Sequence, residues 1–240
     1  MHKFKKYSKK DNYTYVFGAF PTLELLESRA NDIIMVFIDQ KYNDKEKLTN
    51  LLIEKNIAYE ISSTTIRRIA NKDNIYVVAV VNKIKNNILE NKNHVLLHDI
   101  SDMGNLGTII RTMLGFGIKD LALIGNVCDI YNPKVIRASM GAIFKIRFEY
   151  FDSIEEYIKK FDNNLYLFML SNNEEDSILN KKIKYPFSIV MGNEGAGLPQ
   201  YFEKFGEKTF IPQSNEIDSF NLPIATSIGL YEFWRRLWKY

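Results

Sequence analysis

Three short segments in the second half of the chain combine glycines with polar side chains that could take part in chemistry. The first runs from Asp102 to Arg111 and holds Asn105 between Gly104 and Gly107. It follows an apolar run that we expect to be a β-strand, and parallel sheets bind their ligands where strands end. An arginine within a helix is usually a surface salt-bridge partner. The setting of Arg111, close to Asn105 and two glycines at a strand exit, favours a functional role instead.

The second segment, residues 190–198, is a glycine-rich loop that contains Glu194. Its glycines could form a phosphate cradle, but their spacing does not fit G-x-G-x-x-G, and no Lys-Ser/Thr pair follows as a P-loop requires. A simple tight turn is the ordinary interpretation. The charge of Glu194, held between glycines at the expected edge of a sheet, favours a role in a site.

The third segment, residues 211–225, contains Ser219 and Asn221 just before a long helical pattern. Either side chain could cap that helix, and Pro223 suits an early helical position. Capping and catalysis are compatible here, because a helix entrance presents free N–H groups and polar side chains to a ligand.

Alternating strand-like and helix-like stretches must position these segments. In the second part of the chain the expected strands are 95–98, 121–124, 146–150, 165–170, 186–191 and 209–211. We expect residues 104–116 to be a loop that enters a helix, and the other expected helices are 133–140, 154–161, 199–205 and 224–238. This alternation predicts a mostly parallel sheet that is covered on both faces.

The first part of the chain forms a smaller α/β unit, with expected strands at 33–38, 57–61 and 75–81 and helical patterns between them. It contains no obvious nucleophile, phosphate loop or metal cluster. The polar stretch 82–93 marks the boundary. We therefore expect two domains, 1–88 and 89–240, in an α/β protein.

Composition limits the class of protein. The 240 residues are 46% hydrophobic and 25% charged, as in soluble globular proteins. No segment approaches the roughly 18 apolar residues of a membrane span, and no signal peptide is recognisable, so we expect a cytoplasmic protein without a membrane partner. One cysteine and three histidines argue against a structural zinc site.

The first ten residues are strongly basic, although the net charge of the chain is only +3. This segment could be a solvated, frayed tail or a flexible arm that meets phosphate groups. Its lysines, with Tyr7 among them, are Lys3, Lys5, Lys6, Lys9 and Lys10.

In this order, the three segments resemble the three motifs of the SpoU (TrmH-like) branch of the SPOUT methyltransferases. The first reads Asn-x-Gly-x-x-x-Arg, the second Gly-Asn-Glu-Gly-x-Gly-Leu, and the third Ile-Pro followed by Ser-x-Asn-x-x-x-Ala. Residues 137–144 also resemble the family. The likeness covers residues 95–240, and residues 14–81 look, more weakly, like the family's N-terminal RNA-binding domain.

The resemblance implies an RNA ribose 2'-O-methyltransferase with a C-terminal trefoil knot, an exception to the usual rule against threading. It implies S-adenosylmethionine as cofactor, held mostly by backbone around Gly192, Ile211 and Phe220, and it implies a homodimer. The N-terminal domain favours ribosomal RNA, most of all 23S, over tRNA, because several tRNA-modifying members lack such a domain. Where this chain has Met103, Gln213 and Phe220, the family usually has Pro, Met and Leu.

The catalytic residues carried over by the resemblance are Asn105, Arg111, Glu194, Ser219 and Asn221. A sulfonium is already an activated methyl donor, so the reaction needs no metal, whereas the ribose hydroxyl must be oriented and partly deprotonated. Because a guanidinium stays protonated, we expect Arg111 to bind an RNA phosphate and orient the 2'-hydroxyl. Glu194 and Asn105 are expected to position Arg111 and the loop, and Ser219 and Asn221 to shape the methyl-transfer pocket.

Three alternatives remain open at this point. The substrate could be tRNA. The protein could be a non-catalytic RNA-binding or assembly protein, although the joint presence of Asn105, Arg111, Glu194 and Asn221 argues against this. A nucleotide-dependent enzyme is the third alternative, and the glycine spacing argues against it.

Overall fold

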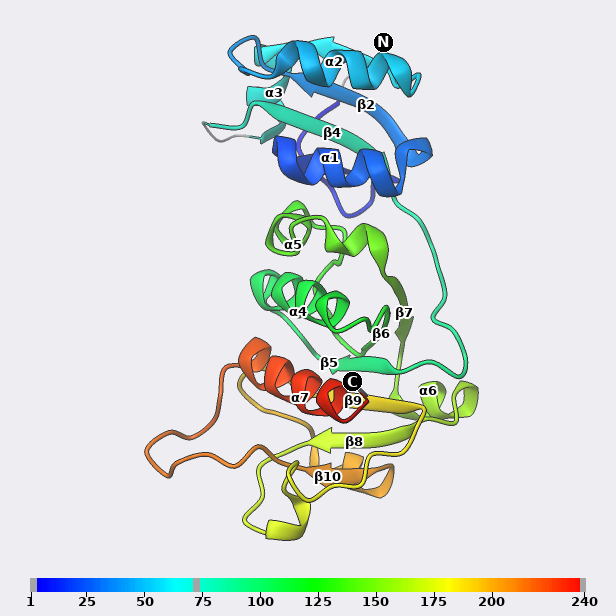
Figure 1. Ribbon diagram of the computed structural model, residues 1–240, viewed down its shortest axis with the longest axis vertical. Helices are drawn as coiled ribbons and strands as arrows, with labels where there is room; N and C mark the ends of the chain where they lie inside the picture. Colours follow the sequence, from blue (N-terminus) through cyan, green and yellow to red (C-terminus); the bar gives the residue numbers. More distant parts are fainter. Residues whose placement is uncertain (1–3, 71–73, 238–240) are drawn as a thin grey trace. The chain divides into compact units, whose positions relative to one another are not determined.

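The structure is a computed structural model that describes residues 4–70 and 74–237. The chain divides into two compact units (Figure 1). Unit 1 takes in the described residues up to 84 together with residues 129–145, and unit 2 takes in residues 85–128 and those from 146 onward. The break after residue 84 is close to the expected boundary at 88, while the functional division into domains stays a prediction.

Unit 1 is built on a mixed four-stranded sheet in the order β1-β4-β2-β3. Its strands are β1 (Tyr13–Phe17), β2 (Ile33–Ile38), β3 (Tyr59–Ile61) and β4 (Val77–Asn82). Strand β4 is antiparallel to both β1 and β2, and β3 is parallel to β2. The helices are α1 (Ala19–Ser28), η1 (Ala30–Asp32), α2 (Lys45–Glu54) and α3 (Ser63–Ala70). The five residues Val77–Val81 are fully buried, which explains why β4 reads as one apolar run.

The segment 129–145 belongs to unit 1 although it lies between two strands of unit 2 in the sequence. It contains α5 (Pro133–Ala138) and the 3-10 helix η2 (Ala142–Lys145). The Thr14 hydroxyl donates to the Tyr131 carbonyl at 2.6 Å, and Arg29 Nε donates to the Phe144 carbonyl at 2.9 Å. These bonds attach the segment to β1 and to the end of α1.

Unit 2 contains a six-stranded parallel sheet in the order β10-β8-β9-β5-β6-β7. The strands are β5 (His94–His98), β6 (Asp120–Ile124), β7 (Arg147–Phe151), β8 (Asn164–Phe168), β9 (Phe187–Met191) and β10 (Glu207–Thr209). The helices are α4 (Met103–Gly115), α6 (Ile154–Lys160), η3 (Glu174–Asp176), η4 (Gln200–Lys204) and α7 (Leu222–Leu237). The expected parallel sheet and α/β class are confirmed. The expected helix 199–205 is the 3-10 helix η4, and Trp238, the last residue of the expected helix 224–238, lies outside the described residues. The trefoil knot stays a prediction.

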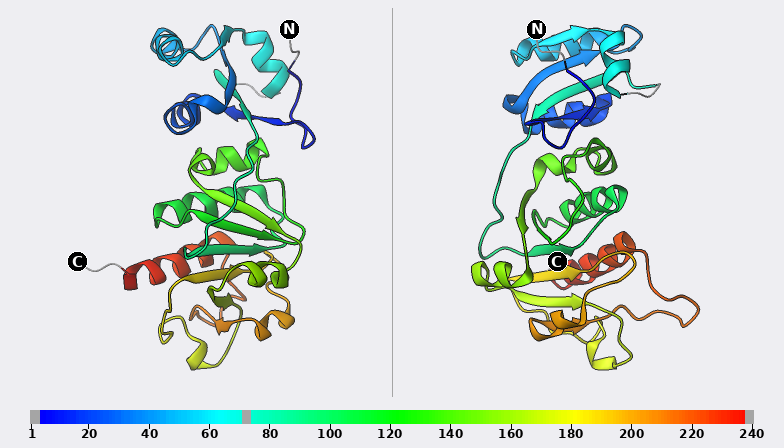
Figure 2. Two further views of the ribbon diagram at one scale, coloured as in Figure 1. Left: turned by 90° about the vertical axis from the view of Figure 1, so that its right-hand side faces the viewer. Right: turned by 180° about the vertical axis from the view of Figure 1, so that it is seen from behind.

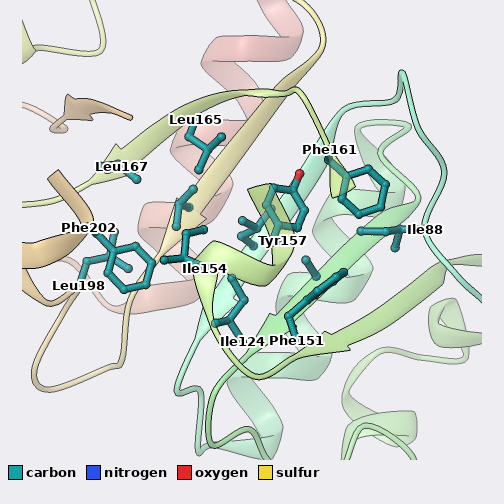
Figure 3. Close-up of a cluster of buried hydrophobic side chains, with 13 residues drawn as sticks. Ile88, Ile124, Phe151, Ile154, Tyr157, Phe161, Leu165, Leu167, Leu198 and Phe202 are labelled. Atoms are coloured by element: carbon teal, nitrogen blue, oxygen red, sulfur yellow. The ribbon is translucent and has the colours of Figure 1, made fainter. Parts of the chain in front are cut away.

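Helices α4 and α7 pack together on one face of this sheet, and α6 and η4 cover the other (Figure 2). A buried cluster fills the α6 side, where Tyr157 and Phe161 lie beside Phe151 (Figure 3). Phe202 of η4 belongs to the same cluster. The hydroxyl of Tyr157 is bonded to His94 Nδ1 at 2.7 Å and to Ser188 Oγ at 2.8 Å, so its polar group is satisfied within the core. The same cluster includes Leu96 of β5 and Val190 of β9, so it packs against two strands in the middle of the sheet.

No helix among the described residues is long and apolar enough to cross a membrane. Within the same residues, no group of three or more His, Cys, Asp or Glu side chains is arranged to hold a metal ion.

Candidate active site

Two loops at the carboxyl ends of neighbouring strands are joined by the Glu194 side chain. Residues 99–102 connect β5 to α4, and residues 192–199 connect β9 to η4. Glu194 Oε1 accepts hydrogen bonds from the Asp102 backbone N–H at 3.1 Å and from Asn105 Nδ2 at 3.3 Å. The structure therefore brings together Asn105 and Glu194, which lie 89 residues apart in the sequence.

Asn193 holds the glycine-rich loop in shape. Its Nδ2 donates to the Asp99 carbonyl at 2.9 Å, and its Oδ1 accepts from the N–H groups of Gly195 at 2.9 Å and Ala196 at 3.1 Å. Its backbone pairs in both directions with Gly197. Both ends of the Asn193 amide are thus occupied in fixing the loop that carries Glu194.

Two glycines of this loop are required by its backbone. A Cβ atom at Gly192 would overlap the backbone of Gly197 and Leu198, and Gly197 has a φ of +67°. Only glycine meets both conditions without strain, since other residues rarely adopt the left-handed region. The spacing of these glycines serves a tight hairpin-like loop, in agreement with the absence of a P-loop pattern.

Helix α4 begins at this junction. The Asp102 carboxylate accepts from the Asn105 backbone N–H at 2.7 Å and caps the helix, while the Asp102 N–H is held by Glu194. Arg111 lies further along the same helix and is exposed. Its guanidinium has no hydrogen bond or salt bridge to any residue that the structure describes, so the ordinary surface salt bridge is not formed.

A cavity of about 370 Å³ opens beside the Glu194 loop. Its size falls within the usual range of small-molecule sites, about 300–1,000 Å³. Of the expected site residues, the cavity is lined by Gly192, Glu194, Ile211, Ser219 and Phe220. Its walls also include apolar side chains from β8 and β9 and from the segments that follow them, among them Phe168, Met191 and Leu198.

Three of the expected residues do not line this cavity. Asn105 reaches it only through its bond to Glu194. Asn221 is exposed, and its carbonyl accepts the first hydrogen bond of α7 from the Ala225 N–H at 2.9 Å. Among the described residues, Arg111 has no hydrogen bond or salt bridge to Asn105 or Glu194. The expected role of Asn105 and Glu194 in positioning Arg111 stays a prediction.

The sequence model of the SpoU rRNA Methylase family matches residues 92–231, which is more than half of the chain. The chain belongs to this family. Membership confirms the resemblance drawn from the three motifs. Residues of the second and third motifs line one cavity, and the bond between Asn105 and Glu194 connects the first motif to it.

Individual members of the SpoU family differ in how much of their sequence this chain matches. An uncharacterized tRNA/rRNA methyltransferase of Synechocystis is 30% identical over 146 residues, which are 60% of this chain but only 53% of that protein. The chain thus spans about half the length of that relative. The 23S rRNA (guanosine(2553)-2'-O)-methyltransferase of Bacillus subtilis is 27% identical over 177 residues, 72% of this chain and 71% of that protein.

Solved structures match over nearly the whole chain. The AdoMet-bound rRNA methyltransferase of Sinorhizobium meliloti gives a TM-score of 0.80 at 26% identity, covering 95% of this chain and 89% of that one. The AdoMet complex of the SpoU methyltransferase AviRb of Streptomyces viridochromogenes gives 0.81 at 22% identity, over 94% and 91% of the two chains, and supports the fold alone. The α/β class, with its smaller N-terminal sheet, is therefore shared by SpoU-family structures.

Sequence reasoning missed three residues of the SpoU-family site in this chain. Asn193 stood inside the second motif, and Asp102 occupies the helix N-cap position, for which aspartate just before a helical pattern is a recognisable signal. Gln213 lines the cavity, and its Nε2 donates to the carbonyls of Ile217 at 3.3 Å and Asp218 at 3.0 Å. Its only signal in the sequence was the departure from the methionine usual in the family.

Proposed function

We propose that this protein transfers a methyl group from S-adenosylmethionine to a ribose 2'-hydroxyl of ribosomal RNA, most of all 23S. Membership of the SpoU family and the name of the Bacillus subtilis relative support the enzyme class, an RNA ribose 2'-O-methyltransferase, and the AdoMet-bound structure from Sinorhizobium meliloti supports the cofactor. The observation that carries the proposal is the bond between Glu194 and Asn105, which ties the first two motifs together beside a cavity that the third motif completes.

The cavity fits the proposed cofactor in its chemistry. Gly192, Ile211 and Phe220 line it, and at Gly192 the backbone of Gly197 and Leu198 approaches too closely to leave room for a side chain. Apolar side chains such as Leu198 offer a face for a planar base. When bound, S-adenosylmethionine supplies an activated methyl group on a sulfonium.

The residues around the cavity have separate tasks in this proposal. Arg111 is exposed and has no partner among the described residues, so its guanidinium is available to bind a phosphate oxygen and orient the adjacent 2'-hydroxyl. Glu194 and Asn105 hold the loop that forms one wall. Ser219 lines the cavity and Asn221 stands at the entrance of α7, where both shape the space in which the hydroxyl approaches the methyl group.

Two further features complete the proposal. The protein acts as a homodimer, in which Arg111 serves beside the partner's cofactor cavity. Unit 1 serves as the RNA-binding part, and its presence favours ribosomal RNA over tRNA. The name of the Bacillus subtilis relative, a 23S rRNA methyltransferase, supports the same substrate class.

The test is methylation of purified RNA with S-adenosylmethionine that carries a labelled methyl group. Unmodified 23S rRNA, 16S rRNA and a tRNA pool are assayed in parallel, and 2'-O-methyl sites are then mapped. We expect label in 23S rRNA at one site or a few sites. Label in tRNA alone would replace the rRNA assignment, and no label in any RNA would favour the non-catalytic RNA-binding alternative.

A further inference from the structure

The N-terminal segment of unit 1, residues 4–12, is fixed on the sheet of that unit, and we call it the strap. The strap is drawn in dark blue beside the four-stranded sheet (Figure 2). The Phe4 ring lies edge-on to Tyr13 at 5.5 Å and to Phe37 at 5.8 Å between ring centroids. Both Phe4 and Tyr7 pack against the buried cluster of unit 1, so the start of the strap is held by apolar contacts.

Hydrogen bonds fix the strap at several further points. The Tyr15 hydroxyl donates to the Lys5 carbonyl, and the Tyr7 hydroxyl donates to Asp129. Lys83 Nζ donates to the Lys9 carbonyl at 2.9 Å and lies 4.8 Å from the centre of the Tyr7 ring. From Phe4 onward this segment is therefore an ordered part of unit 1, while Lys3 lies outside the described residues.

The strap carries the whole net charge of the chain. It contains four lysines and Asp11, which gives a formal charge of +3, equal to that of all 240 residues. The other 28 of the 32 basic residues are balanced by the other 28 of the 29 acidic ones. The lysines are exposed, and none forms a salt bridge with a carboxylate in the described part of the chain; they are Lys5, Lys6, Lys9 and Lys10.

We propose that the strap is a preformed phosphate-binding surface that holds the RNA substrate on unit 1, which rests on the proposed function. Lysine ammonium groups neutralise phosphates and release counterions, and this electrostatic term supplies a large share of nucleic-acid affinity. Because the backbone of the strap is already fixed, binding does not have to order it, and less of the interaction free energy is lost. Phosphates carry no sequence information, so the strap contributes affinity and orientation while the cavity in unit 2 selects the nucleotide.

The experiment compares matched pairs of lysine substitutions. K5Q/K6Q and K9Q/K10Q each remove two charges from the strap. As a control, K47Q/K55Q removes two other exposed lysines, one in α2 and one at its C-cap. Binding of in vitro transcribed 23S rRNA is measured without cofactor at several salt concentrations. We expect each strap pair to weaken binding at least about threefold and to reduce the salt slope by about 1 for each lysine that contacts a phosphate, with the control pair unchanged.

A second variant tests whether the fixed conformation of the strap contributes to RNA binding independently of its charge. Y7F/Y15F removes the hydroxyls that hold the strap and keeps every lysine. We expect weaker RNA binding with an unchanged salt slope, because the same phosphates are neutralised but the strap must first be ordered.

The possible outcomes distinguish this proposal from the proposed function. If the wild type methylates rRNA but the strap pairs behave like K47Q/K55Q, the strap proposal is wrong and the function stands. If the strap pairs lose RNA binding as expected while no RNA is ever methylated, the strap proposal stands and the function is wrong. Binding of the wild type to vesicles of phosphatidylcholine and phosphatidylglycerol, with RNA affinity independent of the strap, would assign the lysines to a membrane surface and overturn the proposal.

Discussion

Arg111 and Glu194 show how differently two charged side chains of one site can be held. Glu194 accepts hydrogen bonds from both the backbone and the Asn105 side chain, so its position is fixed before substrate arrives. Arg111 is exposed and has no partner among the described residues. A guanidinium with free donors suits a group that engages only in the complex, when an RNA phosphate supplies the acceptors.

Substitution of Arg111 tests this role. We expect Arg111→Ala to lower kcat/KM for methyl transfer at least about 100-fold, a loss on the scale of a positioning interaction, while cofactor affinity changes less than about twofold. Arg111→Lys keeps the charge but loses the planar guanidinium. Its kcat/KM should therefore lie between those of the wild type and Arg111→Ala. Single-turnover methylation and calorimetric titration with cofactor measure these quantities. Full activity of Arg111→Ala would contradict the assigned role.

Gln213 supports a second prediction, because its amide N–H groups hold the loop 213–218 at the rim of the cavity. In Gln213→Glu the introduced carboxylate would face the carbonyls of Ile217 and Asp218 and repel them. This repulsion raises the pKa of the carboxylate. We expect cofactor binding about tenfold weaker near pH 8 and partly restored near pH 5, where the protonated acid can donate again.

The control for this pH dependence is Gln213→Met, which lacks both donors at every pH. It should bind cofactor more weakly than the wild type if the two bonds matter, but with no recovery in acid beyond that of the wild type. Cofactor dissociation constants across the pH range decide the matter. Identical pH profiles for the two variants would show that the amide donors have no part in shaping the site.

At the scale of elements, the parallel sheet was predictable because its central strands are buried on both faces. The strands β5, β6 and β9 consist of buried residues throughout, and such strands read as continuous apolar runs. The place of the segment 129–145 in unit 1 could not be predicted from the sequence pattern. Its helix looks like any other, and its partners Thr14 and Arg29 lie more than 100 residues away in sequence.

The site, like the fold, was predictable in its local segments but not in the contacts between them. The loops could be placed at strand ends, and the motifs named Asn105 and Glu194, but no local pattern encodes the bond between them. Gln213 was missed for the same reason, since its hydrogen bonds depend on loop geometry. The basic segment at the start of the chain was recognised, but the sequence left open whether it is a frayed tail or a phosphate-binding arm. The strap lysines alone fit a frayed tail equally well, and it is the packing of Phe4 and Tyr7 that orders them.

The glycine-rich loop gives a prediction at this scale with a built-in control. In Gly192→Ala the new Cβ would overlap the backbone of Gly197 and Leu198, whereas in Gly195→Ala it would meet only Asn193 Oδ1 at 3.6 Å. We expect Gly192→Ala to destabilise the protein by about 1–3 kcal/mol and to abolish measurable cofactor binding. Gly195→Ala should change stability little. Chemical denaturation and cofactor titration of both variants provide the comparison, and equal effects would argue against the close approach.

For the whole molecule, we expect stability to depend on pH through two histidines that are buried in the sheet of unit 2. His94 is fully buried between Tyr157 and the Leu89 carbonyl, and His98 has a buried Nδ1 without a hydrogen-bond partner in the described part of the chain. Burial lowers the pKa of both imidazoles below the usual 6.5. Both are therefore held neutral in the native sheet.

This burial predicts that the protein loses stability as the pH falls from about 6.5 toward 5. In the unfolded chain these histidines become protonated near pH 6.5, whereas in the folded chain they stay neutral until the pH reaches their lower pKa. The free energy of unfolding therefore has its full value above pH 6.5 and decreases as the pH falls below it. Each histidine can contribute at most about 1.4 kcal/mol per pH unit.

His98→Gln removes one of the two groups, so the stability of this variant should fall about half as steeply between pH 6.5 and 5, whatever its absolute value at pH 7.5. Calorimetric unfolding from pH 7.5 to 5.5, with proton uptake taken from buffers of different ionisation enthalpy, measures the slope directly. A slope that is unchanged in His98→Gln would mean that His98 titrates equally in the folded and unfolded chains, contrary to its burial at the end of β5.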